Sequence, residues 1–340
     1  MKTITLAIDC MGGDFGPPVS VAASEIVLKN HPNLHLQLFG DEQQINPLIN
    51  SFSDDLKSRV QIKATSEVVL MDDKPSTALR NKKDSSMRRA LLSVRDGDTQ
   101  ACVSAGNTGA LMALARFTLK MISGIDRPAI ITAIPTSNGH TYMLDLGANV
   151  DCDADVLFQF GIMGSVLSSA TDNLKQPKVG LLNIGEEEIK GNEPVKQAAQ
   201  RLSECQHINY IGFIEGNDIF SGKCDVVVTD GFTGNNVLKA SEGIVRLLAE
   251  KLRSVFERNW LNKLVGLLIK PILKSFKQEI DPDQYNGATL VGLKGIVVKS
   301  HGGASVKATV HAIEEAIIEV EKNVPQRIAK EVEQFVNSRT

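Results

Sequence analysis

Short runs of apolar, often β-branched residues recur along almost the whole chain, and stretches with helical periodicity separate them. Runs that are apolar on both faces are typical of strands buried in a parallel sheet. Nine such runs occupy residues 4–9, 34–40, 100–106, 129–135, 142–147, 178–185, 208–214, 224–231 and 295–303. The helical stretches lie near 18–30, 75–94, 108–121, 151–170, 193–204, 234–258 and 304–320. This alternation predicts an α/β fold with a doubly wound, mostly parallel sheet.

The domain organisation follows from the absence of breaks in this pattern. The sequence contains no Pro-rich or Ser-rich linker and no internal repeat that would divide it. We therefore expect residues 1–340 to form a single α/β catalytic unit. An amphipathic helical segment at 245–278 is predicted to be inserted within that unit.

Composition narrows the class of protein. The chain has 340 residues, of which 42% are hydrophobic and 23% charged, as in ordinary globular proteins. A net charge of −3 argues against a protein that coats nucleic acid, so no nucleic-acid partner is expected. The five cysteines include no C-x-x-C pair, which predicts no metal centre and a reducing compartment. The first residues lack the features of a signal peptide, and no apolar run approaches 20 residues, so we expect a cytoplasmic location.

Six strand ends carry small polar clusters, which lie at residues 9–14, 104–108, 145–149, 183–188, 229–236 and 299–305. In open α/β sheets, ligands bind beyond the carboxyl ends of the strands, where loops meet helix N-termini. The six loops are therefore expected to form one polar, glycine-rich crater. The alternative is structural, because Gly, Asn and Asp also build strand-to-helix turns and helix N-caps.

The glycine-rich motifs favour an anion over a nucleotide. The loop MGGDFGP at 11–17 lacks the G-x-G-x-x-G spacing of dinucleotide sites, and no P-loop motif occurs. The loop SAGNTGA at 104–110 joins a strand to a helix and offers backbone N–H groups, an amide and a hydroxyl to an oxyanion such as phosphate. The loop KSHGGAS at 299–305 adds a Lys and a His beside two glycines. Together these loops predict a phosphate site.

Taken together, the loops resemble those of bacterial phosphate acyltransferases. The matching segments are DxMGGDxGP (9–17), SAGNTGA (104–110), DLGANVD (145–151), NIGEEExKGN (183–192), VTDGFTGN (228–235) and HGGAS (301–305). The resemblance extends over essentially all 340 residues in order. It implies a fold similar to isocitrate and isopropylmalate dehydrogenases and phosphotransacetylase.

The resemblance also implies an activity and partners. Members of this family transfer the acyl group of acyl carrier protein (ACP) to inorganic phosphate. The acyl phosphate passes to a membrane glycerol-3-phosphate acyltransferase in phospholipid synthesis. The family's enzymes are homodimers that associate peripherally with the membrane. Because thiolate is a good leaving group, the chemistry requires binding, orientation and oxyanion stabilisation, with no metal, cofactor or covalent enzyme nucleophile.

We assign roles to the loop residues on this basis. The catalytic candidates, which supply positive charge or acid–base chemistry, are Lys299, His301 and Asp230. The candidates for binding phosphate or acyl phosphate are Asp9, Gly12, Gly13, Asp14, Ser104, Gly106, Asn107, Thr108, Gly109, Asp145, Asn149, Lys190, Asn192, Thr233, Asn235, Gly302 and Gly303. The aspartates would repel phosphate directly, so they are expected to orient the cations or amides, or to act with shifted pKa values. The sequence does not identify the general base.

A basic amphipathic segment points to a membrane surface. Between Lys251 and Lys277 there are seven bases and one acid, Glu257. On a helical projection four lysines (263, 270, 274 and 277) gather on one side, and apolar residues face away from them. With Pro271 expected to kink the helix, this pattern favours insertion into an anionic membrane interface. The predicted membrane contacts are Trp260, Leu261, Leu264, Val265, Leu268 and Ile272. The alternative is a helix packed on the core or on a dimer partner.

A second basic cluster is a candidate docking surface for the acidic carrier protein. It contains Arg80, Lys82 and Lys83, with Arg88 and Arg89 following. A patch of this sign steers an acidic partner, although a solvated helix face is the simpler explanation.

Two functions of other classes remain open on the sequence alone. One is an NAD-linked dehydrogenase on a related fold, which the irregular glycine spacing disfavours. The other is a non-catalytic membrane-bound scaffold or sensor that binds acyl chains without turnover. Acyl-chain preference and the route of product release are not encoded in any motif that we recognise.

Overall fold

One sheet runs through the molecule and positions the other elements. The computed structural model describes residues 3–272 and 286–338. Within them the sheet has eleven strands in the order β3-β2-β1-β4-β11-β10-β5-β6-β9-β7-β8. The strands are β1 (Ile4–Asp9), β2 (Leu34–Gly40), β3 (Val60–Ala64), β4 (Ala101–Ser104), β5 (Ala129–Thr136), β6 (Gly139–Leu144), β7 (Lys178–Leu182), β8 (Asn209–Ile214), β9 (Val226–Val228), β10 (Ala288–Val291) and β11 (Ile296–Lys299).

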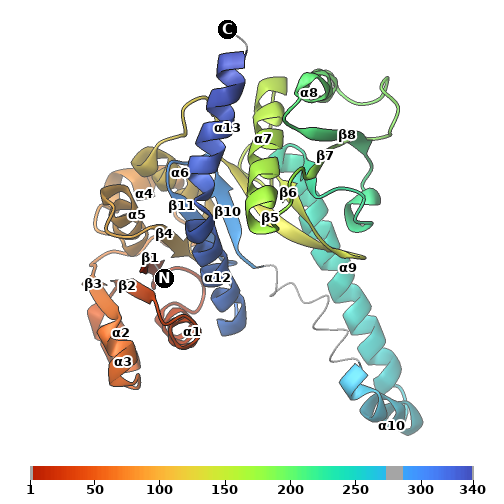
Figure 1. Cartoon of the computed structure of the whole chain (residues 1–340). Coiled ribbons are helices and arrows are strands. Elements are labelled where there is room, and N and C mark those ends of the chain that lie inside the picture. The colour runs from red at the N-terminus through yellow and green to blue at the C-terminus, as the bar shows by residue number, and fades with distance from the viewer. Residues whose placement is uncertain (1–2, 273–285, 339–340) are drawn as a thin grey trace.

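Helices cover both faces of this sheet, as Figure 1 shows. They are α1 (Pro17–Asn30), α2 (Glu42–Ile49), α3 (Asp54–Ser58), α4 (Pro75–Asn81), α5 (Ser86–Asp96), α6 (Thr108–Leu119), α7 (Ala154–Thr171), α8 (Glu193–Glu204), η1 (Asp218–Phe220), α9 (Gly231–Glu257), α10 (Trp260–Leu268), α12 (Val306–Lys322) and α13 (Val324–Ser338). Residues that alternate along the strands enter opposite cores. Leu6 and Ile8 pack with α1 and α12, whereas Ala7 packs with α5 and α6. The α/β class predicted from the alternation is confirmed.

The strand directions reverse in the middle of the sheet. Strands β3, β2, β1, β4 and β11 are parallel to one another, and so are β6, β9, β7 and β8. Between the two sets, the pairs β11–β10, β10–β5 and β5–β6 are antiparallel. Three reversals in succession leave the second set running opposite to the first. The carboxyl ends of the two sets therefore lie at opposite edges of the sheet.

Some elements differ from the predicted ones. The stretch predicted as one helix over 75–94 is two helices, α4 and α5, because the chain turns between Lys82 and Ser85. Strands β3 and β10 and helices α2, α3 and α13 were not predicted. Strand β3 lies at the edge of the sheet and is largely half-buried or exposed, and β10 has only four residues, so neither shows a long apolar run.

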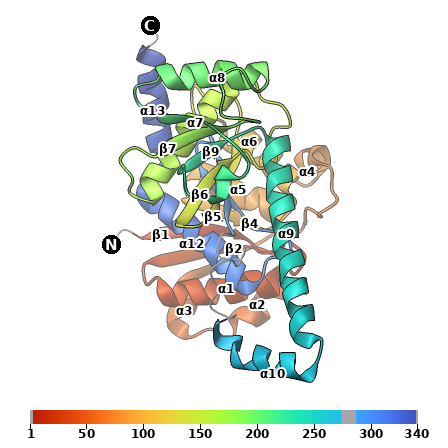
Figure 2. The ribbon, with the colours of Figure 1, turned by 90° about the vertical axis from the view of Figure 1, so that its right-hand side faces the viewer.

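Helices α9 and α10 project from the body of the molecule (Figures 1 and 2). The buried residues of α9 are Gly231 and Gly234 alone, both in its first turn, and α10 has none. The alternative that this segment packs on the core is therefore wrong for the described residues. The helix was predicted to kink at Pro271. It is interrupted before that residue, since α10 ends at Leu268. Lys274 and Lys277 of the predicted basic face lie outside the described residues.

Candidate active site

The predicted loops divide into two groups, so the expectation of a single crater is wrong. The loops after β1, β4 and β11 lie at one edge of the sheet, and the loops after β6, β7 and β9 lie at the other. We call the first group the Lys299 site and the second the Asp145 cluster. Lys299 and Asp230 follow strands separated by β10, β5 and β6. Four strand spacings amount to roughly 19 Å, so these two catalytic candidates do not share one constellation.

Asp9 anchors the Lys299 site. It ends β1, is 3% exposed, and accepts hydrogen bonds from Ser86 Oγ and Ser104 Oγ, each at 2.6 Å. Burial raises the pKa of its carboxyl, while the two hydroxyls and the N–H groups of Met11 and Gly12 oppose the rise. Both carboxylate oxygens are occupied by these donors. Asp9 therefore holds the loops together rather than contacting an anion.

Glycines let the loops after β1 and β4 touch. A Cβ at Gly12 would lie 2.6 Å from the backbone nitrogen of Gly106, a separation that no side chain tolerates. Next to it, Gly13 adopts a φ of 83° and a Cβ there would meet the carbonyl oxygen of Gly302 at 2.8 Å. The N–H of Asp14 donates to that same carbonyl at 2.8 Å. The sequence-predicted residues of these three loops are thus brought together.

Lys299 is the buried cation of the site. It ends β11, is 8% exposed, and its Nζ donates to the carbonyl oxygens of Ala105 at 3.3 Å and of Ser300. Burial lowers the pKa of the amine to about 8, although Asp9 and Asp14 favour its charged form. Lys239 of α9 also lowers that pKa. Near neutral pH the amine is therefore mostly charged, with no carboxylate bonded to it among the described residues.

His301 is held by its neighbours in one tautomer. Its Nδ1 accepts from the N–H of Gly303 at 3.1 Å, which places the ring proton of the neutral form on Nε2. Its own N–H donates to Asn286 Oδ1 at 2.9 Å. Asn286 Nδ2 donates to Ser300 Oγ at 2.8 Å and to the carbonyl of Ala308 at 2.7 Å. Asn286, which the sequence analysis missed, therefore fixes the turn that carries His301.

The start of α6 lies beside this turn, since β4 and β11 are adjacent strands. Asn107 caps the helix by accepting from the N–H of Ala110 at 3.0 Å, and its Nδ2 donates to the carbonyls of Met71 and Asp73. Its side chain is thus engaged in the fold. Thr108 and Gly109 occupy the first helical turn, whose N–H groups have no acceptor within the helix. These groups can bind an oxyanion.

The Asp145 cluster is a network within the fold. Asp145 is fully buried, and its carboxylate accepts from the N–H groups of Ile130, Ala148 and Asn149 and from Asn149 Nδ2, at 2.7–3.0 Å. Burial raises its pKa and these four donors lower it. A Cβ at Gly234 would lie 2.0 Å from the carbonyl oxygen of Asp145, so α9 begins in direct contact with this loop.

The remaining predicted residues of this group are also engaged in local structure. Asp230 caps α9 by accepting from the N–H and Oγ1 of Thr233, at 2.7 and 2.9 Å. Asn235 packs on Gly147, and Asn192 caps α8. The structural alternative, turns and N-caps, therefore describes Asp230 and Asn192 as well as Asn107.

The loop at 183–192 borders a cavity of about 440 Å³, which reaches the first turn of α9. Asn183 Nδ2 donates to the carbonyls of Gly185 and Lys190, each at 3.1 Å, and fixes the shape of the loop. Lys190 was predicted to contact the ligand. In the structure its ammonium forms an ion pair with Glu187 of the same loop, at 2.8 Å.

The cysteines that flank the Lys299 site are buried thiols. Cys10 and Cys102 are fully buried, and burial raises the pKa of both thiols, that of Cys10 to about 12. Among residues 3–272 and 286–338, no three His, Cys, Asp or Glu side chains gather as metal ligands. Nor does any helix in these ranges have the length and apolarity required to cross a membrane.

Comparisons with known proteins decide the family. A family model described as "Fatty acid synthesis protein" matches residues 4–327. A phosphate acyltransferase of Nitrosococcus oceani is 54% identical over 335 residues, 98% of each chain. Those of Methylococcus capsulatus (54% identical, 96% of each chain) and Legionella pneumophila (52% identical, 99% of this chain and 98% of the relative) are similarly close. The chain belongs to the phosphate acyltransferase family.

Solved structures agree on the fold of this phosphate acyltransferase. A phosphotransacetylase from Streptococcus pyogenes aligns with a TM-score of 0.61 over 94% of each chain, at 14% identity. A 4-hydroxythreonine-4-phosphate dehydrogenase from Klebsiella pneumoniae aligns with a TM-score of 0.54, at 13% identity, over 94% of this chain and 98% of its own. At such identities the likeness concerns the fold alone. The family membership shows that the chain is an enzyme of acyl transfer involving phosphate, in fatty acid and phospholipid synthesis.

Proposed function

We propose that this enzyme transfers the acyl group of acyl-ACP to inorganic phosphate, giving acyl phosphate and free ACP. The observation that carries the proposal is the Lys299 site, where a buried amine, closely packed glycine loops and a helix N-terminus meet. A phosphate oxygen attacks the thioester carbonyl, the carbon–sulfur bond breaks, and the thiolate leaves and takes up a proton. Every atom is then accounted for without an enzyme-bound intermediate.

The groups of the Lys299 site match the charges in this reaction. The Lys299 ammonium and the N–H groups of Thr108 and Gly109 favour a phosphate dianion at the carboxyl edge of β4 and β11. His301 Nδ1 accepts from Gly303, so its Nε2–H is the ring group that can hydrogen-bond to the departing thiolate, which takes up its proton from water. Asp9 and Asp14 keep Lys299 charged in spite of its burial. The aspartates therefore support anion binding indirectly.

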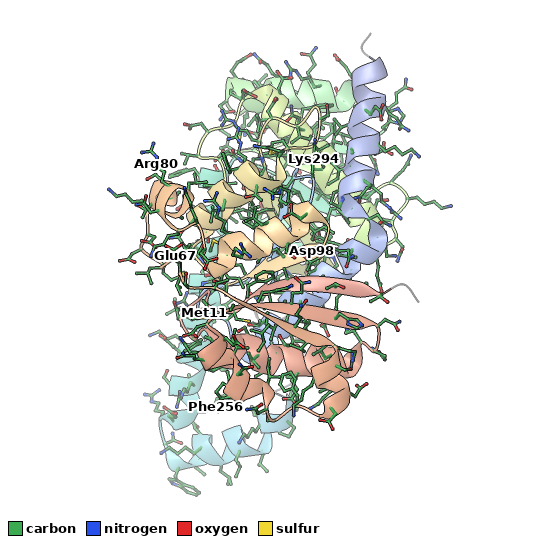
Figure 3. All side chains as sticks on the ribbon, turned by 90° about the vertical axis from the view of Figure 1, so that its left-hand side faces the viewer. Met11, Glu67, Arg80, Asp98, Phe256 and Lys294 are labelled. Atoms are coloured by element: carbon green, nitrogen blue, oxygen red, sulfur yellow. The ribbon has the colours of Figure 1, made fainter. Side chains whose placement is uncertain are left out.

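The carrier protein is proposed to dock beside the same edge. Arg80 and Lys83 are exposed and Lys82 is half-buried at the junction of α4 and α5. Figure 3 shows Arg80 extending outward from α4. Helix α5 begins with Ser86, which bonds Asp9, so the basic junction adjoins the Lys299 site. An acidic carrier would be steered to it by charge.

The projecting helices support the proposed membrane contact and dimer. On α9, exposed Ile244, Leu248 and Val255 lie along one side at helical spacing. On α10, Trp260 is 73% and Leu268 72% exposed. Side chains of this size are seldom left in water in such numbers. We assign the α9 side to a second copy of the chain and α10 to an anionic membrane surface.

Such an arrangement suits the fate of the product. An acyl phosphate with a long chain is poorly soluble, and a peripheral enzyme in the cytoplasm can release it next to a membrane glycerol-3-phosphate acyltransferase. This hand-over and the location are part of the proposal and rest on the family and on the exposed helices.

The proposal is tested with purified protein and palmitoyl-ACP, following the free ACP thiol with and without inorganic phosphate. Thiol release that requires phosphate supports the proposed reaction. If palmitoyl-ACP binds but no thiol appears with any chain length or with liposomes, the transferase reaction with this donor is refuted and a sensor of acyl chains replaces it.

A further inference from the structure

The reaction proposed at Lys299 gives no role to the cavity beside the loop at 183–192. Its volume of about 440 Å³ is within the roughly 300–1,000 Å³ that is usual for ligand pockets. Two other cavities, of about 20 and 140 Å³, are much smaller. The large cavity therefore has room for a substantial part of a substrate.

The walls of this cavity are amphipathic. Exposed Ile184 and half-buried Leu182 and Val195 supply its accessible apolar surface, and the buried side chains of Leu157, Leu181 and Val228 lie beneath it. Asn192 and Asp230 lie among the polar groups that also line it. An apolar interior with a polar rim suits a ligand that carries a long hydrocarbon chain.

The loop beside the cavity adds apolar surface that the protein leaves uncovered. Ile184 and Ile189 are 80% and 83% exposed. The loop is held in shape by Asn183 Nδ2, and by the ion pair of Lys223 with Glu186. Two isoleucines held in water beside an apolar cavity would be covered by an apolar ligand entering it.

Apolar side chains of one hydrophobic cluster lie between this cavity and the Lys299 site, against α9. Half-buried Leu182 lines the cavity, and Leu182, Val237, Leu238 and Ala288 pack against the same hydrophobic cluster. Ala288 is the register partner of Lys299 across β10 and β11. Helix α9 runs from the cavity towards Lys299. Asp230 lines the cavity, and the nine residues from Asp230 to Lys239 rise roughly 14 Å. Lys239 is close enough to Lys299 to influence its charge.

From these observations we infer that the cavity lined by Leu182, Ile184 and Val195 binds the distal part of the fatty acyl chain of the donor. The thioester then lies at the Lys299 site and the chain runs along α9. This inference rests on the proposed function, because it takes a long-chain acyl donor as the substrate. Val195 of α8 lines the cavity, so we expect its side chain to limit the length of the acyl chain that the enzyme accepts.

Filling the cavity tests the inference. Val195→Phe adds bulk from α8, and Gly216→Phe adds it from another wall, where a Cβ at Gly216 would meet nothing within 4 Å. We expect kcat/KM for a C16 donor to fall about tenfold or more relative to a C8 donor, with the KM for phosphate unchanged. The matched control is Gln197→Phe on the exposed side of α8, which should keep the wild-type ratio.

The outcomes separate this inference from the proposed function. If the wild-type protein transfers no acyl group from any donor, the proposed function fails. If it does transfer, but both filled variants fold and keep the wild-type C16 to C8 ratio, the acyl cavity is refuted. Photocrosslinking of the wild-type enzyme with a donor bearing a diazirine at the chain end gives a second readout. Label on a residue that lines the cavity, such as Ile184 or Val195, supports the inference, and label confined to residues outside the cavity overturns it.

Discussion

The charge of Lys299 offers the sharpest test of the phosphate site. Burial lowers the pKa of its amine to about 8, against roughly 10.4 for an exposed lysine. The amine is charged below this pKa and neutral above it. Phosphate affinity should therefore fall as the pH rises through about 8. At saturating acyl donor, kcat/KM for phosphate reports the enzyme form that binds phosphate, so its value carries this titration.

The expected magnitude follows from the titration curve. About three quarters of the Lys299 amine is charged at pH 7.5 and about 3% at pH 9.5, so kcat/KM for phosphate should fall roughly 25-fold. Lys299→Met should lose roughly 10- to 150-fold at pH 7.5, the range for a hydrogen bond to a charged group. Lys299→Arg stays charged at every pH used, so any activity that it retains should lack the alkaline fall.

Steady-state rates at saturating acyl donor, with phosphate varied at each pH, measure these quantities. Lys294→Gln is the matched control, because Lys294 is exposed on the turn before β11 (Figure 3) and should leave the profile unchanged. A kcat/KM for phosphate that stays level from pH 7.5 to 9.5, or that survives Lys299→Met, would refute a phosphate site built around this amine.

Three further predictions concern other parts of the chain. Asp145→Asn should lower the free energy of unfolding by about 3 kcal/mol or more, because an amide cannot accept hydrogen bonds from all four N–H groups. Urea titrations measure this change, and unchanged stability would contradict the network. Reversing Lys82 and Lys83 to Glu should raise the KM for acyl-ACP at low salt and leave the KM for phosphate unchanged; equal kinetics remove the docking surface. Trp260→Ser should weaken binding to anionic phospholipid vesicles about tenfold in sedimentation assays, whereas Ile26→Ser on α1 should not; equal binding by both variants excludes the contact.

The sequence predicted the strands that are apolar on both faces, because burial in a sheet leaves a clear local pattern. It did not predict the reversal between β11 and β6, since strand pairing is a long-range property that no local pattern encodes. The six loops were therefore expected at one edge of the sheet and lie at two.

The site was predictable where several residue types converge in one short loop, as at Lys299 and His301. It was not predictable where distant residues complete it. Ser86 bonds Asp9 across 77 positions, and Asn286 supports His301 across 15. The amphipathic pattern after Asp230 indicated a helix, but not that its Lys239 would lie near Lys299.

The central claim is that phosphate, and not water, receives the acyl group. The most direct measurement first quantifies the ACP thiol released from palmitoyl-ACP, then removes the remaining palmitoyl-ACP, because hydroxylamine also cleaves thioesters, and finally traps acyl phosphate as the hydroxamate. The account predicts equal amounts of the two, both absent without phosphate. Thiol release accompanied by free fatty acid in place of hydroxamate would contradict it, since the enzyme would then hydrolyse the thioester.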